Sequence, residues 1–161
     1  MIIQTSSLGF GKDFTVTSEI PVEEVNEYFA DLEECRALEP LRFEAQLVNH
    51  GKFIDLQADI SVKLSLCCYR CGEIFTRCFA SHVSLKLIEA SSVGGVEEVI
   101  LSEDDLDTIT YQDPQIHLND ILLESIYLEL DDECLCSDNC KGICIQCGKN
   151  LNQGPCSCNL S

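Results

Sequence analysis

The sequence has little positive charge. Ten lysines and arginines stand against 28 aspartates and glutamates in 161 residues, and the formal net charge is −18. Phosphates are repelled by most of such a surface, so this imbalance argues against nonspecific binding to nucleic acid. It is compatible with a basic protein partner.

Long apolar runs and a leader segment are missing as well. No stretch of about 18 apolar residues occurs, so we predict no membrane span and no membrane partner. The first residues, MIIQTSSLGFGK, lack a basic segment followed by a long apolar one, so we expect no secretory signal. Together these absences predict a cytoplasmic protein in a reducing compartment.

Catalytic signatures are also missing. The chain has no phosphate-binding glycine loop and no G-x-S-x-G motif. Its three histidines, His50, His82 and His117, are scattered, and its many carboxylates show no distinctive pairing. We therefore predict that the protein is not an enzyme, has no catalytic residues and takes no small-molecule substrate.

The acidic charge is unevenly spread along the chain. Residues 1–60 carry a net charge of −8, and residues 91–135 carry −13 with no lysine or arginine. Residues 61–90 and 136–161 have net charges of +2 and +1, and they hold ten of the twelve cysteines. The cysteine-rich segments are thus the two parts of the chain that are not acidic.

The hydrophobic pattern predicts an α+β fold with a mostly antiparallel sheet. Apolar side chains alternate with polar ones along three segments, which indicates long strands with one buried face at about 41–47, 54–66 and 75–88. Shorter strand-like pieces are expected within residues 1–17. We interpret residues 91–115 as a mobile acidic loop with strand-like pieces at 97–101 and 108–111.

One or two helices are expected to pack on this sheet. The first should start with Pro21 as its first helical residue and present Val22, Val25, Phe29 and Leu32 on one face. The second should span residues 118–129, capped by Asn119 or Asp120, and dock on the open face of the sheet. Its predicted buried face consists of Leu118, Ile121, Leu122, Ser125 and Leu128.

Cysteine is abundant. Seven of the twelve cysteines fall within residues 134–158, whose sequence is CLCSDNCKGICIQCGKNLNQGPCSC. In a reducing compartment, clustered cysteines are more often metal ligands or catalytic thiols than disulfides. The spacing favours a structural zinc site, because two residues between cysteines let both sulfurs point into one turn. Four thiolates for a tetrahedral Zn²⁺ are available from Cys144, Cys147, Cys156 and Cys158.

A second C-x2-C-G segment, Cys68-Tyr69-Arg70-Cys71-Gly72, lies at the predicted tip of a β-hairpin. It supplies only two ligands, so another pair must reach it in space. One scheme adds Cys136 and Cys140, which gives two four-thiolate sites. The rival scheme pairs it with Cys144 and Cys147, as in a zinc ribbon, and the sequence leaves both schemes open.

Thiols also serve roles other than zinc binding. Four thiolates also bind iron, but no familiar iron–sulfur spacing is present. A redox dithiol normally sits at a helix N-terminus, whereas the first C-x2-C lies between strands. The remaining cysteines lack ligand spacing and are interpreted as packing residues or spectators: Cys35, Cys67, Cys78 and Cys134.

Three blocks of this sequence resemble the YceD family, whose members are large ribosomal RNA subunit accumulation proteins. The blocks are CYRCGEIF at 68–75, IHLNDILLESIYLEL at 116–130 and CKGICIQCGKNLNQGPCSC at 140–158, and the resemblance covers about residues 40–158. The chain departs from the family at Ile145, where proline is common. Some members lack the tail cysteines yet keep the hairpin pair, so tail zinc is not required for the family's shared role.

The resemblance implies a noncatalytic role in large-subunit ribosomal RNA accumulation and large ribosomal subunit biogenesis. We expect residues 1–133 to form the α+β domain and residues 134–161 to form a zinc-binding tail packed on it. The partner would be large-subunit ribosomal RNA or a basic ribosomal protein. The alternatives are a zinc-stabilised protein-interaction module and a thiol or iron redox protein.

Cations near the cysteines suggest where a partner would bind. If the tail packs beside the hairpin, cations from both segments could gather on one face. The predicted RNA or partner contacts are Arg70, Arg77, Lys141 and Lys149, with Lys63 and Lys86 as further members of that face. A zinc ion bound by four thiolates carries a formal charge of −2, which would offset part of this basicity.

Overall fold

The computed structural model describes residues 1–32, 34–90, 108–112, 114–130 and 134–158. One long, twisted sheet dominates it, with strand order β2-β4-β5-β6-β7, and β3 also pairs with β5. Its strands are β2 (Asp13–Ile20), β3 (Arg36–Ala37), β4 (Leu41–Asn49), β5 (Ile54–Cys67), β6 (Ile74–Glu89) and β7 (Thr108–Tyr111). A separate two-stranded sheet joins β1 (Ile2–Gln4) to β8 (Gln115–His117). The pairings between these strands are antiparallel except that of β6 with β7.

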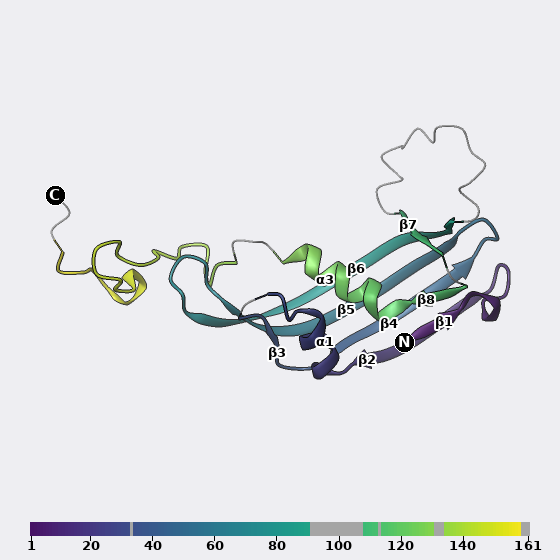
Figure 1. The fold of residues 1–161 in the computed structure, drawn as a ribbon, viewed down its shortest axis with the longest axis horizontal. Helices are drawn as coiled ribbons and strands as arrows, with labels where there is room; N and C mark the ends of the chain where they lie inside the picture. The colour runs from purple at the N-terminus through teal and green to yellow at the C-terminus, as the bar shows by residue number, and fades with distance from the viewer. Residues whose placement is uncertain (33, 91–107, 113, 131–133, 159–161) are drawn as a thin grey trace, which may run out of the picture.

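The core lies on one face of this sheet. Every even position of β5 from Ile54 to Leu66 is buried, as are the odd positions of β4 from Leu41 to Leu47. Helix α3 (Leu118–Glu129) lies across this face, and α1 (Val22–Tyr28) lies toward one end of it (Figure 1). The opposite face carries the polar residues of the alternation, and among the described residues no helix covers it, so it is the open face of the sheet (Figure 1). The predicted α+β fold with its mostly antiparallel sheet is therefore confirmed.

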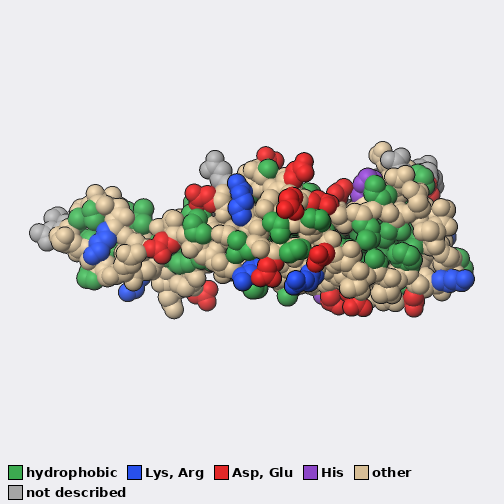
Figure 2. All heavy atoms as spheres, turned by 90° about the horizontal axis from the view of Figure 1, so that it is seen from below, with side chains coloured by type: hydrophobic (Ala, Val, Ile, Leu, Met, Phe, Trp, Pro, Cys, Tyr) green, Lys and Arg blue, Asp and Glu red, His purple; other side chains and the backbone are tan. Residues whose placement is uncertain are grey.

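The molecule is elongated along the β5–β6 hairpin, and the C-terminal segment lies beyond the hairpin tip (Figure 1). In Figure 1, β2 forms the lower edge of the main sheet. Figure 2 shows the molecule from that lower side. Acidic side chains gather over the middle of this view, and hydrophobic side chains gather toward the end that carries β1. No helix within the described residues is long and apolar enough to cross a membrane.

The first helix differs from its prediction. α1 ends at Tyr28, and Pro21 occupies the N-cap position rather than the first helical position. Beyond the helix, Ala30 N–H donates to Glu27 O and Leu32 N–H donates to Phe29 O, both across three residues. These tighter turns bring Leu32 against the core without continuing the α-helix.

The second helix has the predicted bounds but a different buried face. Leu123 and Ile126 are fully buried, whereas Leu128, which was predicted to be buried, is 77% exposed. The predicted side-chain cap is also wrong. His117 is the N-cap, and Leu118 N–H donates to Met1 O at 3.1 Å. The pairing of β1 with β8 brings that carbonyl to the helix start, so no capping side chain is needed.

Part of the predicted acidic loop is a strand. Residues 108–111 form β7, as the sequence suggested, but β7 pairs with β6 in parallel. The other strand-like piece, at 97–101, lies outside the described residues, as does most of the predicted loop. The sequence did not predict the short strands β3 and β8, because they have only two and three residues and no clear alternation.

Candidate metal centres

The hairpin tip forms a tight knuckle. β5 and β6 stay in register up to the pair Cys67 and Ile74, so residues 68–73 make the turn. Cys68 N–H donates to Glu73 O at 2.9 Å, and Gly72 N–H donates to Cys68 O at 2.8 Å. Gly72 has φ +70°, a value that favours glycine. The C-x2-C-G pattern thus closes a loop that presents both sulfurs on its inner side.

The tail repeats this construction. Cys144 N–H donates to Lys149 O at 2.9 Å, and Gly148 N–H donates to Cys144 O at 2.8 Å. Gly148 has φ +71°. CYRCGE and CIQCGK therefore fold into the same knuckle, although one joins two long strands and the other lies in a segment without long secondary structure.

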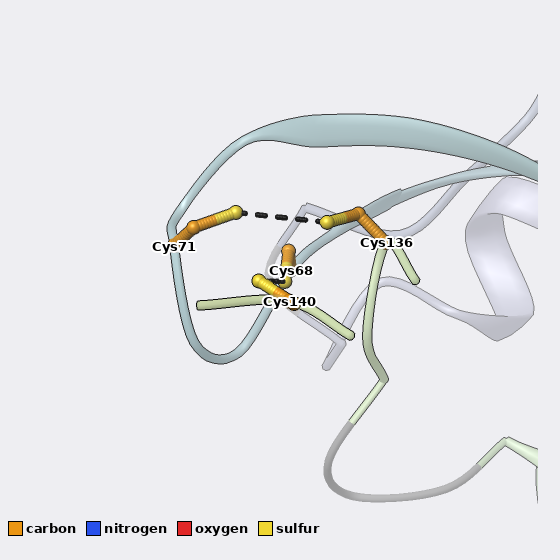
Figure 3. Close-up of side chains that lie close together, drawn as sticks. All are labelled: Cys68, Cys71, Cys136 and Cys140. Carbon is orange, nitrogen blue, oxygen red and sulfur yellow. Dashed lines mark hydrogen bonds between the residues drawn. The ribbon is translucent and has the colours of Figure 1, made fainter. Parts of the chain in front are cut away.

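The hairpin knuckle meets the first pair of tail cysteines. The sulfurs of Cys68, Cys71, Cys136 and Cys140 all lie within 4.8 Å of one another. Figure 3 shows the two pairs facing each other, with Cys68 Sγ 3.7 Å from Cys140 Sγ and Cys71 Sγ 3.8 Å from Cys136 Sγ. Thiolates about 2.3 Å from a tetrahedral zinc stand about 3.8 Å apart. The donor set and its spacing therefore fit a four-thiolate metal site.

The second group lies wholly within the tail. The sulfurs of Cys144, Cys147, Cys156 and Cys158 also lie within 4.8 Å of one another. A 3-10 turn at Leu151–Gln153 reverses the chain between the two pairs. This group is less enclosed than the first. Cys144 is buried, but Cys147 is exposed and the other two are half-buried.

These two groups decide between the two pairing schemes. The structure brings Cys136 and Cys140 to the hairpin knuckle, and it keeps Cys144 and Cys147 with the last two cysteines. The zinc-ribbon scheme, which joined the two knuckles in one site, does not match this geometry. Each knuckle instead has its own partner pair, and each group could hold a metal ion.

Backbone donors favour an ionised thiol at the start of each knuckle. Burial alone raises the pKa of Cys68, but hydrogen bonds from three backbone N–H groups outweigh burial, and the pKa falls to about 6. At Cys144, hydrogen bonds from the N–H groups of Gln146 and Cys147 lower the pKa to about 6. Backbone N–H groups of each knuckle, joined at Cys68 by the N–H of Cys136 in the tail, therefore favour a thiolate, which is the form that binds metal.

One thiol of each partner pair holds its proton more tightly. Burial, together with hydrogen bonds to the other three sulfurs, raises the pKa of Cys136 to about 12. The pKa of Cys158 is raised to about 12, mainly by a hydrogen bond with Cys147 and next by burial. Each group thus combines at least one thiol of lowered pKa with one of raised pKa. A divalent metal ion would take the place of the thiol protons.

Side chains of the tail tie the second knuckle to the first. Glu73 Oε1, beside the hairpin knuckle, accepts from Asn150 Nδ2 at 2.8 Å and from Gln153 Nε2 at 2.7 Å. Asn152 Nδ2 donates to Cys140 Sγ at 3.3 Å, and this bond lowers the pKa of Cys140. The Asn150–Gln153 turn therefore supports the first group as well as reversing the chain for the second.

Backbone contacts bring the tail close to the hairpin. Tyr69 N–H donates to Cys134 O at 2.9 Å. Gly142 has φ +69°, and a Cβ placed there would lie 3.1 Å from Arg70 O. The glycine thus allows both a left-handed backbone and a close approach. Sequence analysis did not identify Glu73, Asn152 or Gly142 as supporting residues, because nothing in their local pattern shows what they meet across the fold.

The four remaining cysteines lie outside both groups. Cys35 is buried in the core, and burial raises its pKa to about 11. A hydrogen bond with Glu34 raises the pKa of Cys67 to about 11. Cys78 is exposed on β6, and Cys134 packs partly against the core. Within the described residues, neither Cys35 nor Cys67 belongs to a group of three or more possible metal ligands.

The predicted contact residues occupy different surroundings. Arg70 Nη1 donates to Cys140 O at 3.5 Å, and Lys149 Nζ donates to Pro155 O at 2.8 Å. These two cations thus lie beside the two sulfur groups. Lys141 is exposed, and its N–H donates to Asn152 Oδ1 at 2.8 Å. Arg77 lies beside two aromatic rings of β6: its guanidinium carbon is 5.9 Å from the centroid of the Phe75 ring and 6.0 Å from that of the Phe79 ring.

Two other cations do not join the knuckles. Lys63 Nζ lies 3.4 Å from Glu39 Oε1, in an ion pair on the body. Lys86 is opposite Asp55, at the end of β5 far from the hairpin tip. The basic face expected from all six cations is therefore not formed, because the long register of the β5–β6 hairpin separates Lys86 from the knuckles.

Comparison with known proteins identifies relatives. A protein from Arabidopsis thaliana, "Large ribosomal RNA subunit accumulation protein YCED homolog 1, chloroplastic", is 27% identical over 142 residues, covering 74% of this chain and 44% of the relative. A protein of the same name from Zea mays is 25% identical over 142 residues, covering 74% of this chain and 48% of the relative. The chain thus spans about half the length of these curated relatives. No solved structure matches it significantly.

The family model "Large ribosomal RNA subunit accumulation protein YceD" matches residues 56–160. The matched region contains all of the β5–β6 hairpin except the first two residues of β5, together with α3 and both sulfur groups. It covers well over half of the chain. The resemblance noted in the sequence is therefore confirmed, and the chain belongs to the YceD family.

Proposed function

We propose that this chain is a noncatalytic factor in large-subunit ribosomal RNA accumulation and in the biogenesis of the large ribosomal subunit. The observation that supports this most strongly is the family match, which spans both knuckles and the helix between them. The two curated relatives carry the same function in their names. Those relatives are named as chloroplastic, so the cytoplasmic location of this chain stays a prediction.

The role proposed for the sulfur groups is structural. Each would hold one Zn²⁺ through four thiolates, the first through Cys68, Cys71, Cys136 and Cys140, and the second through Cys144, Cys147, Cys156 and Cys158. Four protein ligands leave no open position for water or substrate, which is typical of structural rather than catalytic zinc. On this proposal, residues 134–161 form a metal-organised tail on a body of residues 1–133.

The knuckle end is the proposed RNA-contact surface. Its cations are Arg70, Arg77, Lys141 and Lys149, and none of them makes an ion pair with another residue in the described ranges. In contrast, Arg42 and Lys63 on the body are paired with Glu39. Tyr69 adds a ring that is 68% exposed. Cations beside an exposed aromatic ring suit RNA, whose bases stack and whose phosphates need positive charge.

The hairpin cation Arg70 and the tail cation Lys149 also have a second role in this proposal. Each donates to a carbonyl oxygen at or beside a ligand cysteine, Cys140 O and Pro155 O. They would offset part of the negative charge of a zinc tetrathiolate, and so keep the knuckle end from repelling RNA. Lys141 and Arg77 are then the cations most available for phosphate contacts.

Binding to large-subunit ribosomal RNA fragments across a salt series tests this proposal. We expect Lys141→Gln to weaken binding and to reduce the slope of log K against log salt by roughly 0.7–0.9 for one lost phosphate contact. Lys52→Gln, in the β4–β5 turn at the opposite end of the sheet, is the matched control and should bind as the unaltered chain does. Absence of binding at low salt, or equal effects of both variants, would contradict an RNA contact at the knuckles.

A further inference from the structure

The outer edge of β2 is a second surface with the features of a binding site. β2 pairs with β4 over eight consecutive residues without a bulge, and within the described ranges it pairs with no other strand. Its outward backbone groups are thus available to another strand. Natural edge strands are usually protected by lysine, proline, a bulge or short length. The interior of β2, Phe14 to Ser18, contains no lysine or proline, and β2 has twice as many residues as β7 at the other edge.

Side chains on the two faces of this edge differ in chemistry. Phe14 and Val16 face the core side, opposite the buried residues Leu47 and Ala45. Phe14 is nevertheless 37% exposed, and Val16 is only partly buried. A strand added beside β2 would therefore cover apolar surface on that side. In the view from below, hydrophobic side chains gather toward the end of the molecule that carries β1 (Figure 2).

The open face beside the same edge is acidic. A shallow hollow there is lined by Glu19, Glu44 and Asp59, together with Arg42 and Thr17. Glu44 lies directly opposite Asp59 in the β4–β5 register, and like charges in that arrangement repel. Arg42 is already shared between Glu19 at 3.9 Å and Glu39 at 4.0 Å. A lysine or arginine from a partner strand would relieve this repulsion.

A second copy of the chain does not fit this edge. In an antiparallel self-pairing centred on Val16, Asp13 would lie opposite Glu19 in both directions, which places like charges together. Each copy also carries a net charge of −18, so the approach of two copies is repelled. The charges favour a cationic occupant instead.

We infer that β2 binds an extended, basic segment of a partner protein, which adds to the sheet as an antiparallel or parallel edge strand. Backbone hydrogen bonds to β2 would hold it, and its alternating side chains would give specificity. Apolar side chains would lie beside Phe14 and Val16, and lysine or arginine would enter the hollow at Glu19, Glu44 and Asp59. This surface is separate from the RNA contact proposed at the knuckles.

The test uses the full metal-loaded chain and a short peptide in which lysine alternates with valine. We expect saturable binding that protects alternate backbone amides of β2 from hydrogen exchange. A peptide in which glutamate alternates with valine should not bind. Absence of binding of the lysine peptide at low salt, equal binding of both peptides, or protection of amides on another strand would each overturn the inference.

Two substitutions separate edge pairing from general charge attraction. Thr17→Lys adds a cation beside the hollow and should weaken binding of the lysine peptide by about tenfold or more, because like charges then meet across the new pair. Thr110→Lys makes the same change on β7 at the opposite edge and should leave binding nearly unchanged. Equal weakening by both would overturn the inference, as would a stable dimer of the unaltered chain that Thr17→Lys dissociates.

Discussion

The body and the tail of this protein are held together by different means. In the body, strands up to 16 residues long place alternate side chains under α3, and residues such as Leu56 and Leu64 are fully inaccessible to solvent. Within tail residues 134–158, the only buried side chains are those of Cys140 and Cys144. The body therefore has a hydrophobic core, whereas the tail has two sulfur groups in its place.

This difference implies different sources of stability. Burial of apolar side chains stabilises the body whether or not metal is present. A segment as short as the tail cannot bury enough apolar surface to offset its conformational entropy, so we expect its order to depend on metal. The hairpin knuckle belongs to both regions, because β5 and β6 position Cys68 and Cys71 while the tail supplies their partners.

Metal removal should have the largest effect on this contrast. A chelator should remove both zinc ions and abolish protection of tail amides such as Gly148 N–H, while amides of β5 stay protected. In small zinc-dependent peptides, metal binding contributes about 10–16 kcal/mol to folding. Hydrogen exchange measured with and without chelator checks this. A tail that stays protected without metal would contradict the proposed structural role.

Substitution of one knuckle should remove one metal. Cys68→Ser/Cys71→Ser and Cys144→Ser/Cys147→Ser should each reduce zinc content from two equivalents to one, because each knuckle serves a different sulfur group. Cys78→Ser, at an exposed cysteine outside both groups, is the control and should keep both equivalents. Metal analysis of purified protein gives the result. Bound iron with visible colour would instead favour the redox alternative.

A core substitution should affect the body alone. Leu56→Ala removes a fully buried side chain from β5 and should lower the free energy of unfolding of the body by about 2–5 kcal/mol. Gln57→Ala, the next residue on the open face, should change it by less than about 0.5 kcal/mol. Thermal unfolding together with zinc analysis tests both points. Loss of zinc from Leu56→Ala under native conditions would show that the two regions are not independent.

A smaller effect is expected where the tail meets the hairpin. Gly142→Ala combines a left-handed backbone with a close contact to Arg70 O, whereas Gly148→Ala has the same backbone conformation with no atom within 4 Å of the added Cβ. The left-handed backbone alone should cost about 1–2 kcal/mol in each variant. Gly142→Ala should therefore loosen the tail more, measured as hydrogen exchange of Tyr69 N–H. Equal effects would mean that the close contact is unimportant.

The smallest effect is expected at Glu73. Glu73→Gln weakens its hydrogen bonds with Asn150 and Gln153 without changing side-chain size, and should destabilise the docked second knuckle by about 1 kcal/mol. Both zinc ions should remain bound. Amide exchange in residues 150–153 measures the change, and Glu27→Gln on the exposed side of α1 is the control. An effect of the control as large as that of Glu73→Gln would rule out a specific docking role.

Sequence reasoning succeeded where one local pattern dominates. The alternation from Ile54 to Leu66 predicted β5 because successive side chains of a strand point to opposite faces, so a strand with one buried face has an apolar residue at every second position. It failed at α3, where the wide apolar arc includes Leu128, and packing against the sheet selected Leu123 and Ile126 instead. Parallel pairing of β6 with β7 was also missed, because local sequence does not encode the direction from which a distant strand approaches.

By itself, the sequence determined the two long hairpin strands, the bounds of α3 and the two C-x2-C-G knuckles, since each follows from spacing within a short segment. Only the tertiary structure decided which cysteines meet. Cys136 and Cys140 lie more than 60 residues from Cys68 and Cys71 along the chain, and the length of the β5–β6 hairpin and the path of α3 bring them together. A spacing of two residues fixes the geometry within one pair, whereas the choice of partner pair depends on the fold that carries both.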